Sequence, residues 1–131
     1  MSAPSAMPAM ADPNFVLLYV NSPATSAAFY ADLLGTPPVE ASPTFAMFAS
    51  ASGTMLCLWA AHTVAPAATA AGGAELAFAV ATVATVNTMH NSWRAKGLPI
   101  VQPPTGMDFG FTFVALDPDG HRLRVFAPGA A

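Results

Sequence analysis

Residues Thr112–Phe126 read TFVALDPDGHRLRVF and predict two β-strands joined by a tight turn. The turn is Asp117-Pro118-Asp119-Gly120, in which proline fixes its own φ and glycine permits a positive φ. The apolar and β-branched residues on either side favour strands near Phe111–Leu116 and Arg122–Phe126. This hairpin therefore forms the end of a β-rich unit.

The residues before the hairpin complete that unit. Glu75–Val80 predicts a strand, and Thr82 is typical of the residue that caps a helix. The helix is expected to run to about Ala95 and to be closed by Gly97, with a short strand following near Ile100–Gln102. The second half of the chain thus has the order β-α-β-β-β.

The first half repeats this order. Asn14–Val20 predicts a strand, Ser22-Pro23 begins a helix to about Leu34, and Gly35 closes it. Short strands are expected near 38–41, 44–50 and 54–60. The matched pairs that define the repeat are Val20 with Val80, Ser22 with Thr82, Gly35 with Gly97 and Gly53 with Gly120.

The repeat predicts one α+β domain over residues 14–127. Its halves, at about 14–61 and 74–127, are joined by an Ala/Thr/Pro/Gly-rich connector, Ala61–Gly73. Two curved four-stranded sheets, when paired, form a partly closed barrel with a cleft. Residues 1–13 are expected to be a flexible leader.

The composition limits the function. The chain is 54% hydrophobic and 8% charged, with four basic residues and a net charge of −3, so nucleic acid is not an expected partner. Few charges leave apolar surface for a dimer interface or a ligand cleft. The chain contains no run of about 18 apolar residues, so no membrane span is expected. The single Cys57 indicates a reducing compartment, and the leader lacks a signal-peptide pattern, so we expect a cytoplasmic protein.

Together, the repeat, the segment SPATSAAFYADLLG and the segment DPDGHRLRVF resemble the vicinal oxygen chelate superfamily. This superfamily includes glyoxalase I, extradiol dioxygenases and bleomycin-binding proteins. Within it, FGFTFVALDPDGHRLRVF, TMLCLW and LLYV are most similar to the phenazine antibiotic-resistance proteins. That resemblance implies a metal-free homodimer that binds a tricyclic aromatic drug. Phe111 departs from the pattern, which has a basic residue there.

The resemblance also locates where the superfamily's enzymes hold a divalent metal. The four equivalent positions here are Phe15, Cys57, Glu75 and Arg124. Phenylalanine has no donor atom, and arginine is a permanent cation that would repel a metal. We therefore expect no metal and no cofactor. His62, His90 and His121 are expected to be surface or turn residues.

Glu75 and Arg124 suggest a different use of these positions. Both are expected to face the cleft from neighbouring strands, where they could form an ion pair. Two alternatives stay open: both side chains reach solvent at the cleft mouth, or Arg124 binds a ligand carboxylate through two parallel hydrogen bonds.

Alternate residues of a strand share a face, so strand parity decides which residues line the cleft. Most of the residues that it places there are aromatic. Parity places Phe109, Phe111 and Phe113 together unless Gly110 forms a bulge. Trp93 is instead expected to pack between helix and sheet. The predicted ligand-binding residues are Phe15, Tyr19, Trp59, Glu75, Met107, Phe109, Phe111, Phe113 and Arg124.

The sequence favours non-catalytic binding and sequestration of a planar aromatic antibiotic, phenazine-like by resemblance. The alternative is a metal-dependent glyoxalase-type lyase or dioxygenase with a displaced metal site. A third interpretation is a relative that binds an unrelated metabolite or only a protein partner.

Overall fold

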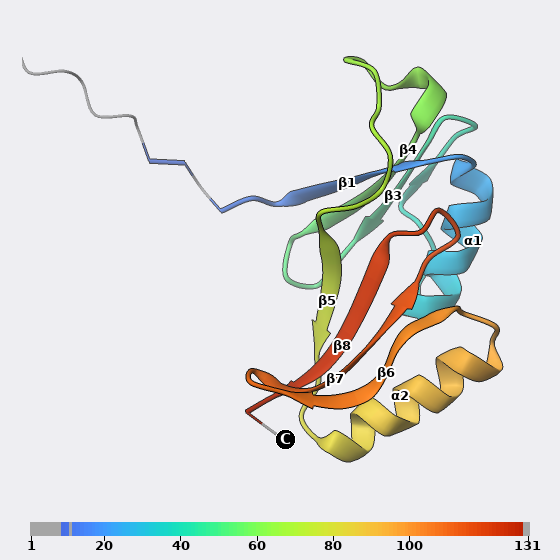
Figure 1. The fold of residues 1–131 in the computed structure, drawn as a ribbon. Helices are drawn as coiled ribbons and strands as arrows, with labels where there is room; N and C mark the ends of the chain where they lie inside the picture. The colour runs from blue at the N-terminus through green and yellow to red at the C-terminus, as the bar shows by residue number, and fades with distance from the viewer. Residues whose placement is uncertain (1–8, 11, 130–131) are drawn as a thin grey trace, which may run out of the picture.

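The computed structural model describes residues 9–10 and 12–129, so most of the predicted leader lies outside the described residues. Both repeats have the predicted order (Figure 1). The first contains β1 (Phe15–Val20), α1 (Pro23–Leu34), β2 (Glu40–Ala41), β3 (Phe45–Ala49) and β4 (Met55–Ala60). The second contains β5 (Glu75–Ala79), α2 (Val83–Ala95), β6 (Ile100–Met107), β7 (Gly110–Leu116) and β8 (Arg122–Pro128).

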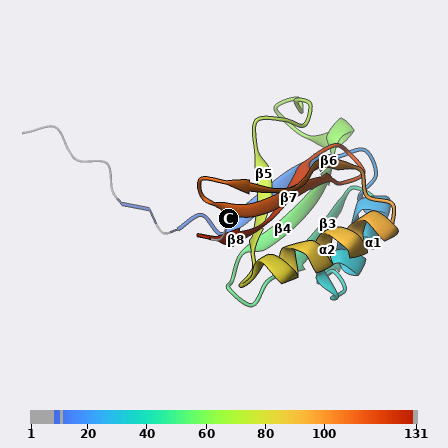
Figure 2. The ribbon, with the colours of Figure 1, turned by 60° about the horizontal axis from the view of Figure 1, so that its bottom comes forward.

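The strands form two four-stranded sheets of equivalent topology. Sheet A has the order β1-β4-β3-β2, and sheet B has the order β5-β8-β7-β6. In each, the first and last strands of the repeat pair in parallel, whereas the other pairs are antiparallel. The two sheets share no strand pairing in the described chain and do not close a barrel. Both helices lie on one side of the strands, so the other side is an open face (Figures 1 and 2).

The predicted helix caps are confirmed. Ser22 Oγ accepts a hydrogen bond from the Thr25 amide at 3.2 Å, and Thr82 Oγ1 accepts one from the Thr85 amide at 3.1 Å. Each bond satisfies a backbone donor that the first helical turn would otherwise leave unpaired. Gly35 follows α1 with φ of +70°, a left-handed conformation that glycine adopts without a Cβ penalty. The same local chemistry therefore starts both helices.

The helix-covered face holds the hydrophobic core. One buried cluster unites Tyr30 and Phe48 of the first repeat with Trp93 and Phe113 of the second. The Trp93 and Phe113 rings are 5.3 Å apart and nearly perpendicular, an arrangement that aromatic pairs favour. This confirms that Trp93 packs between helix and sheet.

The β7–β8 turn joins the two repeats through a buried polar contact. The hydroxyl of Tyr30 on α1 donates to Asp117 Oδ2 at 2.7 Å. Asp117 Oδ1 accepts from the amides of Asp119 and His121, and Asp119 Oδ1 accepts from the Asn21 amide. Burial raises the pKa of the Tyr30 phenol, and its hydrogen bond to Asp117 raises it further. The FYADLLG and DPDG motifs thus form the junction between repeats.

One predicted strand was too short. The third strand of the second repeat was expected near Ile100–Gln102, but β6 continues to Met107 through Pro103 and Pro104. Because β6 is an edge strand, prolines there need not remove a ladder hydrogen bond. Its pairing with β7 shifts register on both sides of Gln102.

In the described residues, no helix is long and apolar enough to cross a bilayer.

Candidate ligand-binding site

The centre of the candidate site is the guanidinium of Arg124 on the open face of sheet B. In β8, Arg124 lies between Ala77 of β5 and Val114 of β7. Its Nε donates to Glu75 Oε1 at 2.6 Å, and its Nη2 donates to Glu75 Oε2 at 3.3 Å. The side chains of Arg124 and Glu75 are 16% and 32% exposed. The two residues therefore form a partly buried ion pair.

Two neutral side chains complete the hydrogen bonding of Arg124. Nη1 donates to Thr112 Oγ1 at 3.2 Å and to Gln102 Oε1 at 3.3 Å. Thr112 Oγ1 in turn donates to the backbone oxygen of Val125 at 2.9 Å, which orients the hydroxyl. Since a guanidinium has five N–H donors, these four bonds leave one Nη2 N–H for another acceptor.

Phe109 lies beside this network, at the turn between β6 and β7. Its ring centroid is 5.5 Å from Arg124 Cζ and 5.9 Å from the Phe126 ring. Gly110 has φ of +150°, and a Cβ there would collide with the backbone oxygen of Ala127. The missing side chain lets the turn approach β8, so that Phe109 contacts Arg124 while staying 43% exposed.

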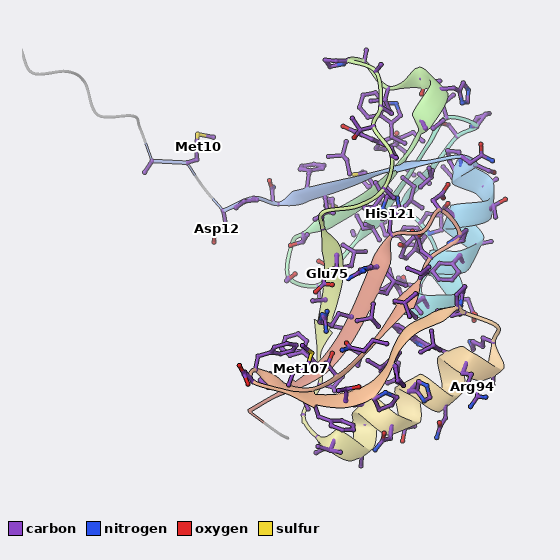
Figure 3. The ribbon with its side chains drawn as sticks, in the orientation of Figure 1. Met10, Asp12, Glu75, Arg94, Met107 and His121 are labelled. Atoms are coloured by element: carbon purple, nitrogen blue, oxygen red, sulfur yellow. The ribbon has the colours of Figure 1, made fainter. Side chains whose placement is uncertain are left out.

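Met107 extends the same apolar surface. It is half-exposed at the end of β6, and its sulfur accepts a weak hydrogen bond from Gln102 Nε2 at 3.4 Å. Figure 3 shows Met107 at the free end of the β6–β7 hairpin, whereas Arg94 lies on the far side of α2. The predicted residues Glu75, Arg124, Phe109 and Met107 thus belong to one open surface.

The placement of Phe111 and Phe113 on this surface was wrong. Phe113 pairs with Val125 in β8, is fully buried and packs against the Trp93 and His90 rings of α2. Phe111 pairs with Ala127 and packs against the same core. Phe109 breaks the parity because it lies in the turn, and the two strand phenylalanines point to the helix-covered face.

A second group of predicted residues lies on the open face of sheet A. Tyr19 pairs with Trp59 across β1 and β4, and their rings are 6.4 Å apart. Phe15, two positions from Leu17 on the same face, is 52% exposed. Cys57 lies between them and is buried; burial raises the pKa of its thiol, and the Glu40 carboxylate raises it further. This group is aromatic and apolar.

The two groups meet at a hollow between β1 and β5. Its volume is about 240 Å³, and Tyr19, Glu75 and His121 line it together with connector residues. The Nε2 atom of His121 lies 3.2 Å from the backbone oxygen of Tyr19. In Figure 3, Glu75 and His121 both lie in the region between the two sheets.

The donors at the positions where the resemblance would place a metal do not fit a divalent ion. Both oxygens of Glu75 are bound to a permanent cation, and Phe15 offers no donor atom. Across residues 9–10 and 12–129, no three His, Cys, Asp or Glu side chains are grouped so that they could hold a metal ion.

Sequence reasoning missed Thr112, Gln102 and a second hollow. Thr112 could have been found from the β7–β8 register, because even-numbered residues of β7 share a face with Arg124. The second hollow, of about 490 Å³, lies between the repeats on the helix side. Its lining includes Val16, Leu34, Phe48, Leu56, Leu76 and Phe78.

Comparison with known proteins places the whole domain in one family. The sequence pattern of the Glyoxalase/Bleomycin resistance protein/Dioxygenase superfamily matches residues 13–125. The phenazine antibiotic resistance protein EhpR of Enterobacter agglomerans is 28% identical over 116 residues, which are 86% of this chain and 89% of that protein.

Solved structures share the fold. A protein of Agrobacterium tumefaciens determined by solution NMR is 49% identical, with a TM-score of 0.85 over 92% of this chain and 100% of that one. A glyoxalase-related enzyme of Fulvimarina pelagi is 22% identical, with a TM-score of 0.79 over 90% of this chain and 88% of that one. At that identity, the second likeness shows the fold alone.

Proposed function

Because the chain belongs to the Glyoxalase/Bleomycin resistance protein/Dioxygenase superfamily, we propose that it binds a planar, phenazine-like antibiotic without transforming it. By sequestering the drug, it would give resistance. The similarity to EhpR supports this class of ligand. The proposal assigns the chain no metal, no cofactor and no catalytic residue.

The observation that carries the proposal is the contact between Phe109 and Arg124. The half-exposed aromatic ring lies beside a guanidinium that four hydrogen bonds hold in place. A planar ligand can stack on such a surface, and each aromatic contact adds about 0.5–1.5 kcal/mol beyond area burial. The carboxylate and the cation at this position are already paired with each other. The arrangement therefore suits binding better than bond-breaking chemistry.

A second copy of the chain would complete the cleft. Phe15, Leu17, Tyr19, Met107 and Phe109 are all large, apolar and at least 37% exposed. Such a surface on a helix-free face is typical of an interface or a ligand groove. In a twofold dimer, sheet A of one protomer would cover sheet B of the other, giving two equivalent clefts. The aromatic group would then lie opposite the Arg124 group.

The expected affinity follows from ligand size. A drug of about 20 heavy atoms, at about 0.3–0.4 kcal/mol per atom, gains about 6–8 kcal/mol and so binds with micromolar Kd. Capture at that affinity protects a cell only when the protein is abundant or passes the drug to an exporter.

The two tryptophans provide a direct test. Trp59 is partly exposed on the open face, whereas Trp93 lies on α2 and is buried against sheet B. Titration with phenazine and its 1-substituted derivatives should quench Trp59 with a micromolar Kd, in the presence of EDTA as in its absence. Trp59→Ala should lose the quenching, because Trp93 is shielded from the open face. Absence of quenching by every planar aromatic tested would contradict the proposal.

The rival function is a metal-dependent lyase or dioxygenase with a displaced metal site. It would require the Glu75 carboxylate to release Arg124 and bind a metal instead. Metal analysis of the purified protein separates the two: stoichiometric bound metal, and loss of ligand binding on EDTA treatment, would favour the enzyme.

A further inference from the structure

We propose that Glu75 makes this site select planar aromatics that carry a neutral hydrogen-bond acceptor over those that carry a carboxylate. This inference rests on the proposed function and names the ligand class of the same site. It depends on the charge and on the donor geometry of the Arg124 network.

The charge of Arg124 is already offset. Both Glu75 oxygens bind the guanidinium, at 2.6 Å and 3.3 Å. A ligand anion brought to Arg124 would also approach the Glu75 carboxylate, and in a partly buried site this repulsion is screened less than in water. A neutral amide, quinone or ring-nitrogen acceptor meets no such repulsion.

The free donor geometry agrees with this selection. A carboxylate binds arginine best through two parallel N–H groups on one edge of the guanidinium. Glu75 occupies the edge formed by Nε and Nη2, and Thr112 and Gln102 occupy both hydrogens of Nη1. One Nη2 N–H remains, which suits a single acceptor.

Two other charged groups lie near this face. Arg122 is opposite Glu75 in the β5–β8 pairing, two residues before Arg124, and is exposed. Asp108 lies beside Phe109 in the β6–β7 turn and is also exposed. Charges in such positions are solvated and contribute little to pairwise interactions. Selection is therefore expected to depend on Glu75.

The test compares phenazine-1-carboxamide with phenazine-1-carboxylate at neutral pH, by calorimetry on the purified protein. The wild type should bind the carboxamide at least about fivefold more tightly. Glu75→Gln keeps the shape of the side chain but removes its charge, so the affinity ratio should move toward the carboxylate by about tenfold or more, as expected for a charge-assisted hydrogen bond.

Asp108→Asn is the matched control, since it removes the same negative charge from an exposed position in the turn beside Phe109. It should change the ratio by less than about threefold. The methyl ester of phenazine-1-carboxylic acid gives a second test on the wild type alone, which does not depend on the folding of a variant. The neutral ester should bind more tightly than the carboxylate.

Two results would overturn the inference while leaving the proposed function intact. One is equal or tighter binding of the carboxylate by the wild type; the other is an unchanged ratio in folded Glu75→Gln. If none of the phenazines binds, the proposed function itself fails, and the selectivity fails with it.

Discussion

Phe109 and Phe113 are four positions apart in the sequence, yet they lie on opposite faces of sheet B. Phe113 is fully buried against Trp93, whereas Phe109 is 43% exposed beside Arg124. The covered face has its partners within the chain, in the helices. The open face keeps aromatic rings and one polar network without such a cover. The difference indicates that one face holds the fold together and the other is available for a ligand.

The strongest test of this division is to remove each ring in turn. Phe113→Ala should lower the free energy of unfolding by about 3–5 kcal/mol, because it leaves a cavity in a packed core. Phe109→Ala should change it by less than about 1 kcal/mol and should weaken phenazine binding instead. Urea unfolding and calorimetry measure the two effects. Equal destabilisation by both variants would show that the faces do not differ in this way.

The junction between the repeats gives the next largest effect. Tyr30→Phe should destabilise the fold by about 1.5–3 kcal/mol, because the buried Asp117 carboxylate loses a hydrogen-bond donor. The reference variant is Tyr19→Phe, whose hydroxyl lies on the open face. A loss no greater than that of Tyr19→Phe would argue against a junction role.

The raised pKa of Tyr30 predicts a pH dependence with a definite sign. Above pH 10, the unfolded chain releases the phenol proton near the unperturbed pKa of 10.0, while the folded chain retains it. The unfolded state then binds fewer protons, so wild-type stability should fall as pH rises through this range. The difference in stability between wild type and Tyr30→Phe should shrink over the same range. A difference that stays constant between pH 8 and 11 would be inconsistent with this assignment.

The ion pair on the open face should contribute less than the junction. A double-mutant cycle with Glu75→Gln and Arg124→Met should give a coupling energy of about 1–2 kcal/mol, since the pair is neither fully buried nor fully exposed. Chemical denaturation of the four proteins provides the numbers. Additive single effects would mean that the pair is not coupled in solution.

The smallest expected change in chain stability accompanies disruption of the proposed dimer. Leu17→Lys places a charge at the centre of the exposed face of β1 and should shift the protein from dimer to monomer in light scattering. Val39→Lys is the control, because Val39 is exposed but precedes β2 instead of lying on that face. An unchanged mass for Leu17→Lys, or a monomeric wild type, would remove the two-chain cleft.

Much of the fold could be predicted because its signals are local. Ser22 and Thr82 cap the helices, and the Asp117–Gly120 turn fixes the β7–β8 hairpin. The repeat then extends each assignment to the other half. The length of β6 could not be predicted in this way, since only its position at the sheet edge allows Pro103 and Pro104 within a strand.

The site was partly predictable, and the main error in predicting it came from the register of the β7–β8 hairpin. The hairpin pairs Leu116 with Arg122, so even-numbered residues of β7 share a face with Arg124. That register places Thr112 beside Arg124 and Phe113 on the other face. Gln102 and the hollow between the repeats depend on a register shift and on tertiary packing, which no local pattern contains.

The most direct test of the central claim is a nitrogen-15 NMR titration of the protein with phenazine-1-carboxamide. We predict saturable shifts at the Arg124 Nε–H and at the amides of Phe109 and Thr112, with the Trp93 indole unchanged. Shifts confined to the lining of the larger hollow on the helix side, such as those of Thr36 and Thr54, would contradict the account. So would the absence of any shift at millimolar ligand.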